Sequence, residues 1–324
     1  MQVHFYLPQR YLPDPARQEA WRSGKITQLE EAGKIACAQC WIYQTWVALE
    51  RSGFVVRLAH EIPSEGILVA LTNLLMADFR VPERVFFVGV VADYLADARA
   101  HLHLVQNNAH ARRLRNSAFM PLWPHPNLRA RDPARLDRFE NICFFGESSN
   151  LAPELADPRW QDKLRKELGL NFIICGADRW HDYREADCVV AIRGFGRSRY
   201  IHKPATKLYN AWLAGVPFIG GRDSAYASSG VPGRDFLQAA TPGELFDHLR
   251  RLQADPSLRK QLVVAGAISG RNFSFNATLE RWQRLLGETV PELAARWREK
   301  SRSERRVFRA LQAASVWLDS RVRS

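Results

Sequence analysis

The sequence has no apolar run long enough to cross a membrane, and its mean hydropathy is −0.30. Its first residues, Met1–Pro8, are too short and too uncharged a stretch for a signal peptide. It has only five cysteines, an odd number, and without an export signal this count indicates reduced thiols. We therefore expect a cytoplasmic protein without structural disulfides.

Several motifs that would identify an enzyme class are also missing. There is no G-x-G-x-x-G for a dinucleotide, no G-x-x-x-x-G-K-[ST] for a nucleoside triphosphate, and no convincing D-x-D pair for a divalent ion. Cys37 and Cys40 form a C-x-x-C, but no second ligand pair accompanies them, so we interpret both as packed side chains. The sequence thus predicts neither a metal site nor a bound cofactor.

Positive charge is abundant, with 46 Lys and Arg against 34 Asp and Glu, a formal net charge of +12. A chain of 324 residues that is 46% hydrophobic can bury two modest cores, which favours two domains. The charge predicts an anionic partner. Nucleoside diphosphates, anionic lipid and nucleic acid all meet that description, so charge alone does not choose among them.

The segment 202–221 combines a helix pattern with a short apolar strand. Pro204 suits the first turn of a helix, Gly215 suits its end, and residues 216–219 follow as a buried strand. The predicted helix N-terminus carries Lys203, Thr206 and Lys207, two ammonium groups and a hydroxyl beside unsatisfied backbone N–H groups. This combination suits a phosphate group.

Residues 206–217, which end in Ala214-Gly215-Val216-Pro217, resemble the nucleotide-sugar site of glycosyltransferases with the GT-B fold. In that family a helix of the C-terminal domain is entered through a short polar motif and left through A-G-x-P. Many retaining members have two Glu residues here, whereas this chain has Lys203 and Asn210 at about those positions. The resemblance therefore implies donor binding by Lys203 and Asn210, without the paired-Glu role.

The resemblance covers about residues 142–285 and implies an α/β fold with two Rossmann-like domains facing a cleft, followed by C-terminal helices. Continuous apolar runs in both halves of the chain are typical of parallel sheets covered on both faces. Prolines concentrate between the halves and indicate a stiff connector. The predicted parts are an acceptor domain at 1–117, a linker at 118–138, a donor domain at 139–288 and a basic amphipathic helix at 289–324.

Polar turns follow the predicted strands of the donor domain, where open α/β sheets bind ligands. Six of their residues are candidates for donor contacts, together with Lys203, Thr206 and Lys207 at the helix start. Glycine lets backbone N–H groups approach a diphosphate or sugar closely, and arginine supplies charge. Gly146 and Ser148 follow the first strand of this domain, and Arg193 is a candidate for contact with the phosphates. The GT-B resemblance implies that Gly176 and Arg179 lie beside the base. Ser224, after the strand at 216–219, is a candidate for contact with the donor sugar.

The acceptor domain offers three candidates for the base that removes a proton from the acceptor hydroxyl. His60 and Glu61 follow one predicted strand, and Asp93 follows another. Each of these side chains equally suits a loop cap or a solvated surface. The sequence does not choose among them.

The function that these patterns favour is transfer of a sugar from a nucleoside-diphosphate sugar to an unknown acceptor, in the assembly of a surface glycan or on a lipid-linked acceptor. The cations beside a helix N-terminus can neutralise the leaving diphosphate without a metal. An alternative is a non-catalytic protein that binds nucleotide sugars or glycans with a degenerate fold. Nucleic acid is a remote alternative, because few aromatic residues that stack bases lie among the cations.

The C-terminal segment 291–324 contains nine Lys or Arg against four Asp or Glu. Val307, Leu311, Ala314 and Leu318 form an apolar stripe at helical spacing. This pattern predicts either a helix peripheral to an anionic membrane surface or a helix whose Leu311, Trp317 and Leu318 pack on the N-terminal domain.

Overall fold

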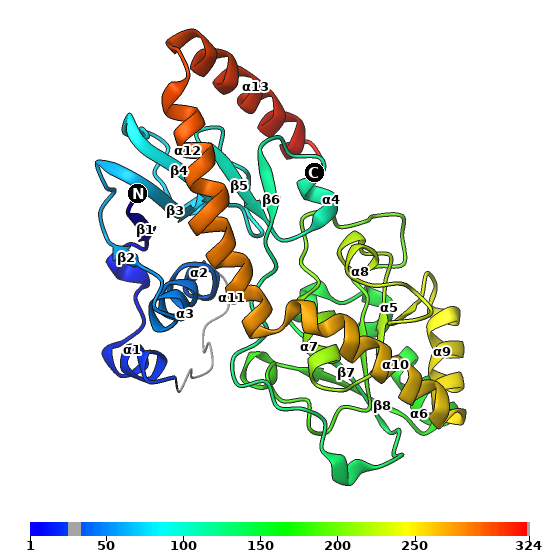
Figure 1. Ribbon diagram of the computed structural model, residues 1–324. Helices are drawn as coiled ribbons and strands as arrows, with labels where there is room; N and C mark the ends of the chain where they lie inside the picture. The colour runs from blue at the N-terminus through cyan, green and yellow to red at the C-terminus, as the bar shows by residue number, and fades with distance from the viewer. Residues whose placement is uncertain (25–33, 323–324) are drawn as a thin grey trace. The chain divides into compact units, whose positions relative to one another are not determined.

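A computed structural model of the chain describes residues 1–24 and 34–322, and it contains two compact units. Unit 1 comprises Met1–Leu122, His202–Pro204 and Phe275–Ser324, and unit 2 comprises Trp123–Ile201 and Ala205–Ser274. Residues 25–33 and 323–324, of which the latter end the predicted C-terminal helix segment 289–324, lie outside the described residues. Secondary structure labels are those of Figure 1.

Unit 1 contains a six-stranded sheet in the order β2-β1-β3-β4-β5-β6, in which every neighbouring pair is parallel. The two longest strands are almost wholly buried because their residues are apolar on both faces. The strands are β1 Val3–Tyr6, β2 Val56–Ala59, β3 Glu65–Leu71, β4 Arg84–Val90, β5 Leu102–Val105 and β6 Ser117–Phe119. The last of these lies partly in the segment for which the sequence predicted only a linker.

Helices from both ends of the chain cover this sheet. The predicted helix over about 34–52 is present as α2 and α3 joined by a π-helical turn at Gln39–Tyr43. The helices of unit 1 are α1 Pro15–Arg22, α2 Lys34–Ala38, α3 Gln44–Arg51, α4 Asn108–Ala111, α11 Phe275–Arg284, α12 Val290–Glu299 and α13 Arg302–Ser320.

Helices α11 and α12 run across one face of the six-stranded sheet (Figure 1), although the sequence predicted α11 as part of the donor domain. Their indole side chains explain this position. Trp282 is fully buried, with its ring 5.9 Å from that of Phe5 in β1. Trp297 lies 4.4 Å from the ring of His101, beside β5. The C-terminal helices therefore complete the core of unit 1.

Unit 2 contains a parallel five-stranded sheet in the order β11-β10-β9-β7-β8. Its strands are β7 Asn141–Phe145, β8 Asn171–Cys175, β9 Cys188–Ala191, β10 Phe218–Gly220 and β11 Leu237–Gln238. The chain passes from β7 outward to β8 and then returns to place β9 on the other side of β7. That reversal puts a topological switch point between β7 and β9, where doubly wound sheets form their ligand crevice.

Six helices accompany this sheet, and the one after β9 carries the phosphate-binding motif of the sequence. They are α5 Pro153–Ala156, α6 Pro158–Leu168, α7 Thr206–Leu213, α8 Ser224–Ser229, α9 Pro242–Ala254 and α10 Pro256–Gly270. Gly215 adopts a left-handed conformation with φ +71° just beyond α7, where glycine is favoured. No helix among the described residues is sufficiently long and apolar to traverse a bilayer.

Helix α7 begins at Thr206, two residues later than the Pro204 start that the sequence predicted. Polar side chains of unit 1 hold the preceding residues instead. The amide of Gln106 donates to the carbonyl oxygen of His202 at 3.0 Å, and that of Asn107 donates to the carbonyl oxygen of Lys203 at 3.2 Å. These bonds explain why 202–204 belongs to unit 1 while α7 belongs to unit 2.

Candidate functional site

Gly146, at the carboxyl end of β7, lies in contact with Lys207 in the first turn of α7. A Cβ atom at Gly146 would lie 2.7 Å from Cε and 2.9 Å from Nζ of Lys207, so only glycine admits this side chain here. The ammonium group also lies 5.3 Å from the ring centre of Phe144, a cation–π distance. The glycine turn and the first-turn lysine that the sequence singled out are therefore in contact at the switch point.

Arg193 follows β9 and is held by a buried carboxylate. Its Nε donates to Oδ2 of Asp223 at 3.0 Å, and its Nη1 donates to Oδ1 of Asn150 at 2.6 Å. The Asp223 side chain is 1% exposed. Burial raises the pKa of Asp223 above its ordinary value, while Arg193 and then Lys207 oppose that rise. Arg193 is thus fixed in one orientation and has part of its charge neutralised.

Thr206 lies at the first position of α7, and its side-chain oxygen is buried. Among the described residues this Oγ1 has no hydrogen-bond partner. A buried hydroxyl without a partner is costly in a folded protein unless a ligand or water satisfies it. Beside it the first-turn N–H groups of α7 are the positive end of the helix dipole. Thr206, Lys207 and the helix start, which the sequence predicted as part of a phosphate site, therefore lie together in unit 2.

The remaining donor candidates of unit 2 lie at the same carboxyl edge of the sheet. Ser148 begins the exposed turn after β7, and Ser224 begins α8 after β10. Gly176 directly follows β8, where its carbonyl oxygen accepts the backbone N–H of Arg179 at 2.9 Å. Arg179 also borders a cavity of about 330 Å³ together with Cys175. The structure thus distributes these four residues over the ends of β7, β8 and β10.

Lys203 does not lie with Lys207 in the first turn of α7. It belongs to unit 1, where its Nζ lies 3.4 Å from Oδ1 of Asp93. The reason is the later start of the helix, because the two hydrogen bonds to the backbone of 202–204 hold this segment against unit 1. This geometry corrects the expectation of two lysines on one helix N-terminus.

Asn210 also has a structural partner. It is 4% exposed within α7, and its Oδ1 accepts the backbone N–H of His125 at 3.0 Å. The side chain therefore supports the segment around His125 rather than presenting its carbonyl oxygen at the helix start.

The three candidate bases do not form one cluster. His60 and Glu61 follow the edge strand β2, and Nδ1 of His60 bonds to the carbonyl oxygen of Leu7 at 2.8 Å. Asp93 follows β4, three positions along the sheet, and strands are spaced about 4.8 Å apart. Its Oδ1 accepts the amide of Gln106 at 2.9 Å and lies beside Lys203. Asp93 is the candidate that has polar neighbours arranged around it.

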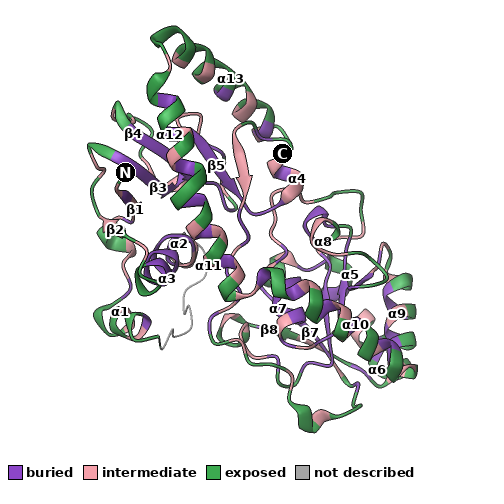
Figure 2. Ribbon diagram, in the orientation of Figure 1, coloured by how far each residue is buried: buried purple, intermediate pink, exposed green. Residues whose placement is uncertain are grey.

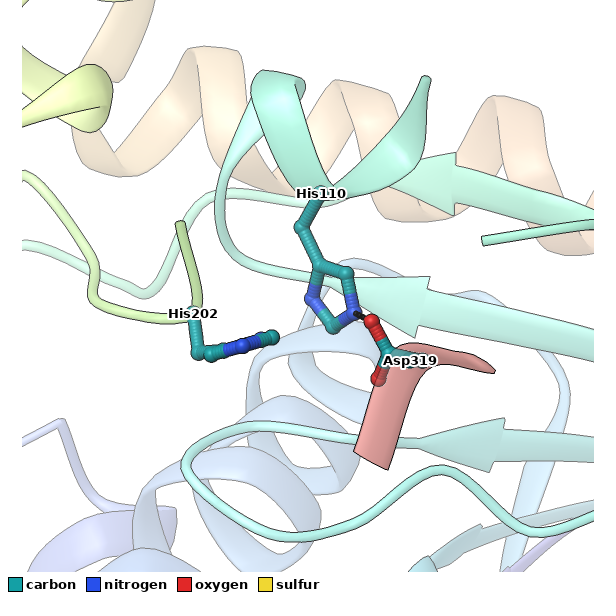
Figure 3. A group of neighbouring side chains, drawn as sticks. All are labelled: His110, His202 and Asp319. Atoms are coloured by element: carbon teal, nitrogen blue, oxygen red, sulfur yellow. Dashed lines mark hydrogen bonds and ion pairs between the residues drawn. The ribbon is translucent and has the colours of Figure 1, made fainter. Parts of the chain in front are cut away.

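Sequence reasoning missed one polar cluster, formed by His110 of α4, His202 and Asp319 of α13 (Figure 3). Nε2 of His110 lies 2.9 Å from Oδ1 of Asp319, and both side chains are 1% exposed. The rings of the two histidines are perpendicular, with centroids 4.6 Å apart. Each residue has one potential ligand atom within 4.8 Å of the others, so these residues are where a metal ion would find ligands in unit 1. No spacing in the sequence links positions so far apart.

Comparison with known proteins gives matches only at the level of structure. No family model matches the chain, and no curated protein matches its sequence. HepE of Anabaena, solved with UDP and glucose, has a TM-score of 0.55 at 12% identity, covering 89% of this chain and all of that one. AviGT4, a glycosyltransferase of avilamycin A biosynthesis, has a TM-score of 0.53 at 16% identity over 82% and 91% of the two chains. The chain has a GT-B fold.

A third GT-B structure, sucrose-phosphate synthase of Thermosynechococcus elongatus, has a TM-score of 0.51 at 12% identity and covers 80% of this chain and 79% of its own. The GT-B resemblance of residues 206–217 thus predicted the fold correctly. Its two-domain division of the chain differs in detail, since helices α11 to α13 and residues 202–204 belong to unit 1.

Proposed function

We propose that this protein transfers a sugar from a nucleoside-diphosphate sugar to an acceptor hydroxyl, and that unit 2 binds the donor. The observation that carries the proposal is the contact of Lys207 with Gly146 at the switch point of the unit 2 sheet. The GT-B fold supports it, and HepE, which shares the fold, was solved with UDP and glucose. The base, the sugar and the acceptor are left open.

In this proposal the donor diphosphate lies at the start of α7. Lys207 and the first-turn N–H groups would bind its oxygens, and the buried hydroxyl of Thr206 would donate to one of them. Arg193, fixed by Asp223, would add positive potential at the end of β9. Together these groups would stabilise the negative charge that develops as the diphosphate departs.

The transfer itself exchanges one C–O bond for another. The acceptor oxygen bonds to the anomeric carbon, the bond from that carbon to the phosphate oxygen breaks, and the diphosphate leaves with the electron pair. The acceptor proton passes to a base. Asp93 is our first candidate for that base in unit 1, because Gln106 and Lys203 orient it.

Two measurements test the proposal in sequence. The first is thermal shift with UDP, GDP and ADP, which should raise the unfolding temperature for at least one nucleotide in the wild type. The second is release of nucleoside diphosphate from a panel of nucleotide sugars with candidate acceptors. Absence of stabilisation by all three nucleotides would refute the donor site.

A second candidate function is binding of nucleotide sugars without catalysis. Many retaining enzymes have two acidic residues where this chain has Lys203 and Asn210. Here Lys203 pairs with Asp93, and Asn210 is buried. The replacement of the acidic pair favours binding without catalysis. Stabilisation by a nucleotide without turnover of any nucleotide sugar would favour this alternative.

A further inference from the structure

Helix α13 docks on unit 1 through two buried polar side chains and two apolar ones, and it exposes its remaining large apolar residues. Gln312 is fully buried, and its Oε1 accepts the amide of Asn116 at 2.8 Å while its Nε2 lies 3.0 Å from Nδ1 of His103. Two turns further along, Asp319 bonds to His110 at 2.9 Å (Figure 3). Phe308 also packs against Trp297 with ring centroids 5.0 Å apart, and Val316 packs against a buried cluster that includes Val91 and Val105. The helix is therefore fixed to unit 1 by these four side chains, which leaves its other large apolar residues exposed.

Those apolar residues form a stripe on the outer side of α13, which is mostly exposed in Figure 2. Val307, Leu311, Trp317 and Leu318 have exposed fractions of 58, 46, 53 and 54%. The sequence had offered packing of Leu311, Trp317 and Leu318 on the N-terminal domain as one of two outcomes. The helix does pack there, but these three side chains face away from unit 1.

A strongly basic pocket of about 300 Å³ is lined by α13, by Trp297 of α12 and by residues at the start of β4. Arg302, Arg306 and Arg309 line it from one face of α13, at the spacing of successive helical turns. Among the described residues none of the three has an acidic partner within salt-bridge distance. A fourth lining residue, Arg305, is already engaged with Glu83 at 3.6 Å. The pocket therefore has three guanidinium groups available to an anion.

Two aromatic side chains complete the pocket. The guanidinium of Arg305 lies 5.3 Å from the ring of Trp297, which fixes that wall. Nδ1 of His101 accepts the backbone N–H of Phe87 at 2.8 Å, so the neutral ring has its hydrogen on Nε2. Burial, with Arg309 and Arg305 nearby, lowers the pKa of His101 to about 3, so the ring is a neutral donor.

We propose that α13 binds an anionic phospholipid surface, with the phosphate of a lipid headgroup between Arg302, Arg306 and Arg309 and the apolar stripe in the acyl boundary. Each residue turns an α-helix by about 100°, so Val307 lies about 100° around α13 from Arg306, and the apolar stripe flanks the basic one. A helix with one apolar side and a basic flank is typical of interfacial binding. The charge of residues 291–324 is complementary to such a surface. This inference does not depend on the proposed sugar transfer.

Co-sedimentation of the full chain with vesicles tests it. Binding should require phosphatidylglycerol in a phosphatidylcholine bilayer and should weaken as salt rises. The variant R302Q/R306Q/R309Q should lose on the order of 100-fold in vesicle affinity, given about 1 kcal/mol for each basic residue at an anionic surface. The variant V307S/L311S/L318S should lose binding at every salt concentration.

The matched control R165Q/R250Q/R251Q removes the same charge from exposed positions of α6 and α9 in unit 2 and should bind as the wild type does. Circular dichroism shows whether each variant is folded. Inorganic phosphate at constant ionic strength separates a lipid site from a site for a free phosphate compound. The proposal is overturned if the wild type stays in the supernatant at low salt, if the arginine variant binds like its control, or if phosphate alone abolishes vesicle binding.

Discussion

At the scale of single residues, the proposed donor site should depend chiefly on Lys207. Replacing it with Ala should weaken binding of the preferred nucleoside diphosphate by on the order of 1.5–3 kcal/mol, the loss of a charge-assisted hydrogen bond, or roughly ten- to 150-fold. Isothermal titration with UDP, GDP and ADP measures this. Lys166→Ala, at an exposed position of α6, is the control. Equal affinities in wild type and K207A would remove Lys207 from the site.

Lys203 should behave differently from Lys207, because it lies beside Asp93 in unit 1. We expect Lys203→Ala to change turnover more than nucleotide affinity. A loss of nucleotide affinity as large as that of K207A would show that the sequence-based assignment of both lysines to the diphosphate was right.

The choice of catalytic base is also made at this scale. Asp93→Asn should lower kcat by about 10²–10⁴, the usual contribution of a general base, with nucleotide affinity unchanged. Glu61→Gln should leave kcat near its wild-type value, because Glu61 follows the edge strand β2. Steady-state kinetics with a responsive acceptor compares the two. The reverse result would transfer the role to the end of β2.

At the scale of secondary structure elements, Asp187 forms hydrogen bonds that hold the start of β7 to Arg131 and Arg135. Its buried carboxylate accepts from Arg135 at 2.7 Å, from Arg131 at 2.8 Å and from the backbone N–H groups of 140 and 141. Asp187→Asn should lower the free energy of unfolding by about 3 kcal/mol, because both guanidinium groups lose a buried partner. Urea unfolding at pH 7 measures the difference. Asp247→Asn, in an exposed pair with Arg250, should cost less than about 1 kcal/mol.

The effect of Asp187 also has a pH dependence with a definite sign. Burial raises the pKa of this carboxyl, but hydrogen bonds from Arg135, from the backbone of 140 and 141 and from Arg131 together hold it below its ordinary value of 3.8. The stabilisation is therefore present above pH 3.8 and is lost as the pH falls through the lower folded value. The gap in stability between wild type and D187N should shrink below pH 3.8. A constant gap would contradict the ion-pair explanation.

The elements themselves were largely predictable from sequence because their patterns are local. Apolar runs marked β3, β4 and β7, and Gly215 marked the end of α7. The predicted start of α7 was wrong because Pro204 suits the first turn of a helix. In the structure the side-chain amides of Gln106 and Asn107 donate to the backbone carbonyl oxygens of 202 and 203, and these long-range hydrogen bonds hold that segment outside the helix. In the same way a 3.6-residue period showed that α13 has an apolar stripe, but not that Gln312 and Asp319 would form its inner face.

At the scale of the whole molecule, we expect sugar transfer without a divalent ion. Lys207 and the N–H groups at the start of α7, together with Arg193, would supply the positive charge that a metal would otherwise bring to the leaving diphosphate. Activity should survive EDTA. If it were lost and then restored by Mg²⁺ or Mn²⁺, His110→Ala would show whether the cluster with His202 and Asp319 is responsible.

The division of the chain into units was the part of the architecture least accessible to sequence. Composition and the resemblance of the A-G-x-P helix predicted two α/β domains, and the structure contains two parallel sheets. The assignment of α11 and α12 depends instead on Trp282 against Phe5 and Trp297 against His101, contacts between residues about 200 or more positions apart. Such pairings leave no local pattern to read.

This arrangement has a consequence for synthesis on the ribosome. The sheet of unit 1 is made first, yet the helices that cover one of its faces, α11 and α12, are made near the end of the chain. Unit 2 comprises Trp123–Ile201 and Ala205–Ser274, so all its residues have been made once Ser274 has been translated. The nascent N-terminal strands therefore keep an apolar face uncovered while about 150 further residues of unit 2 are translated, an interval in which a chaperone has a surface to bind.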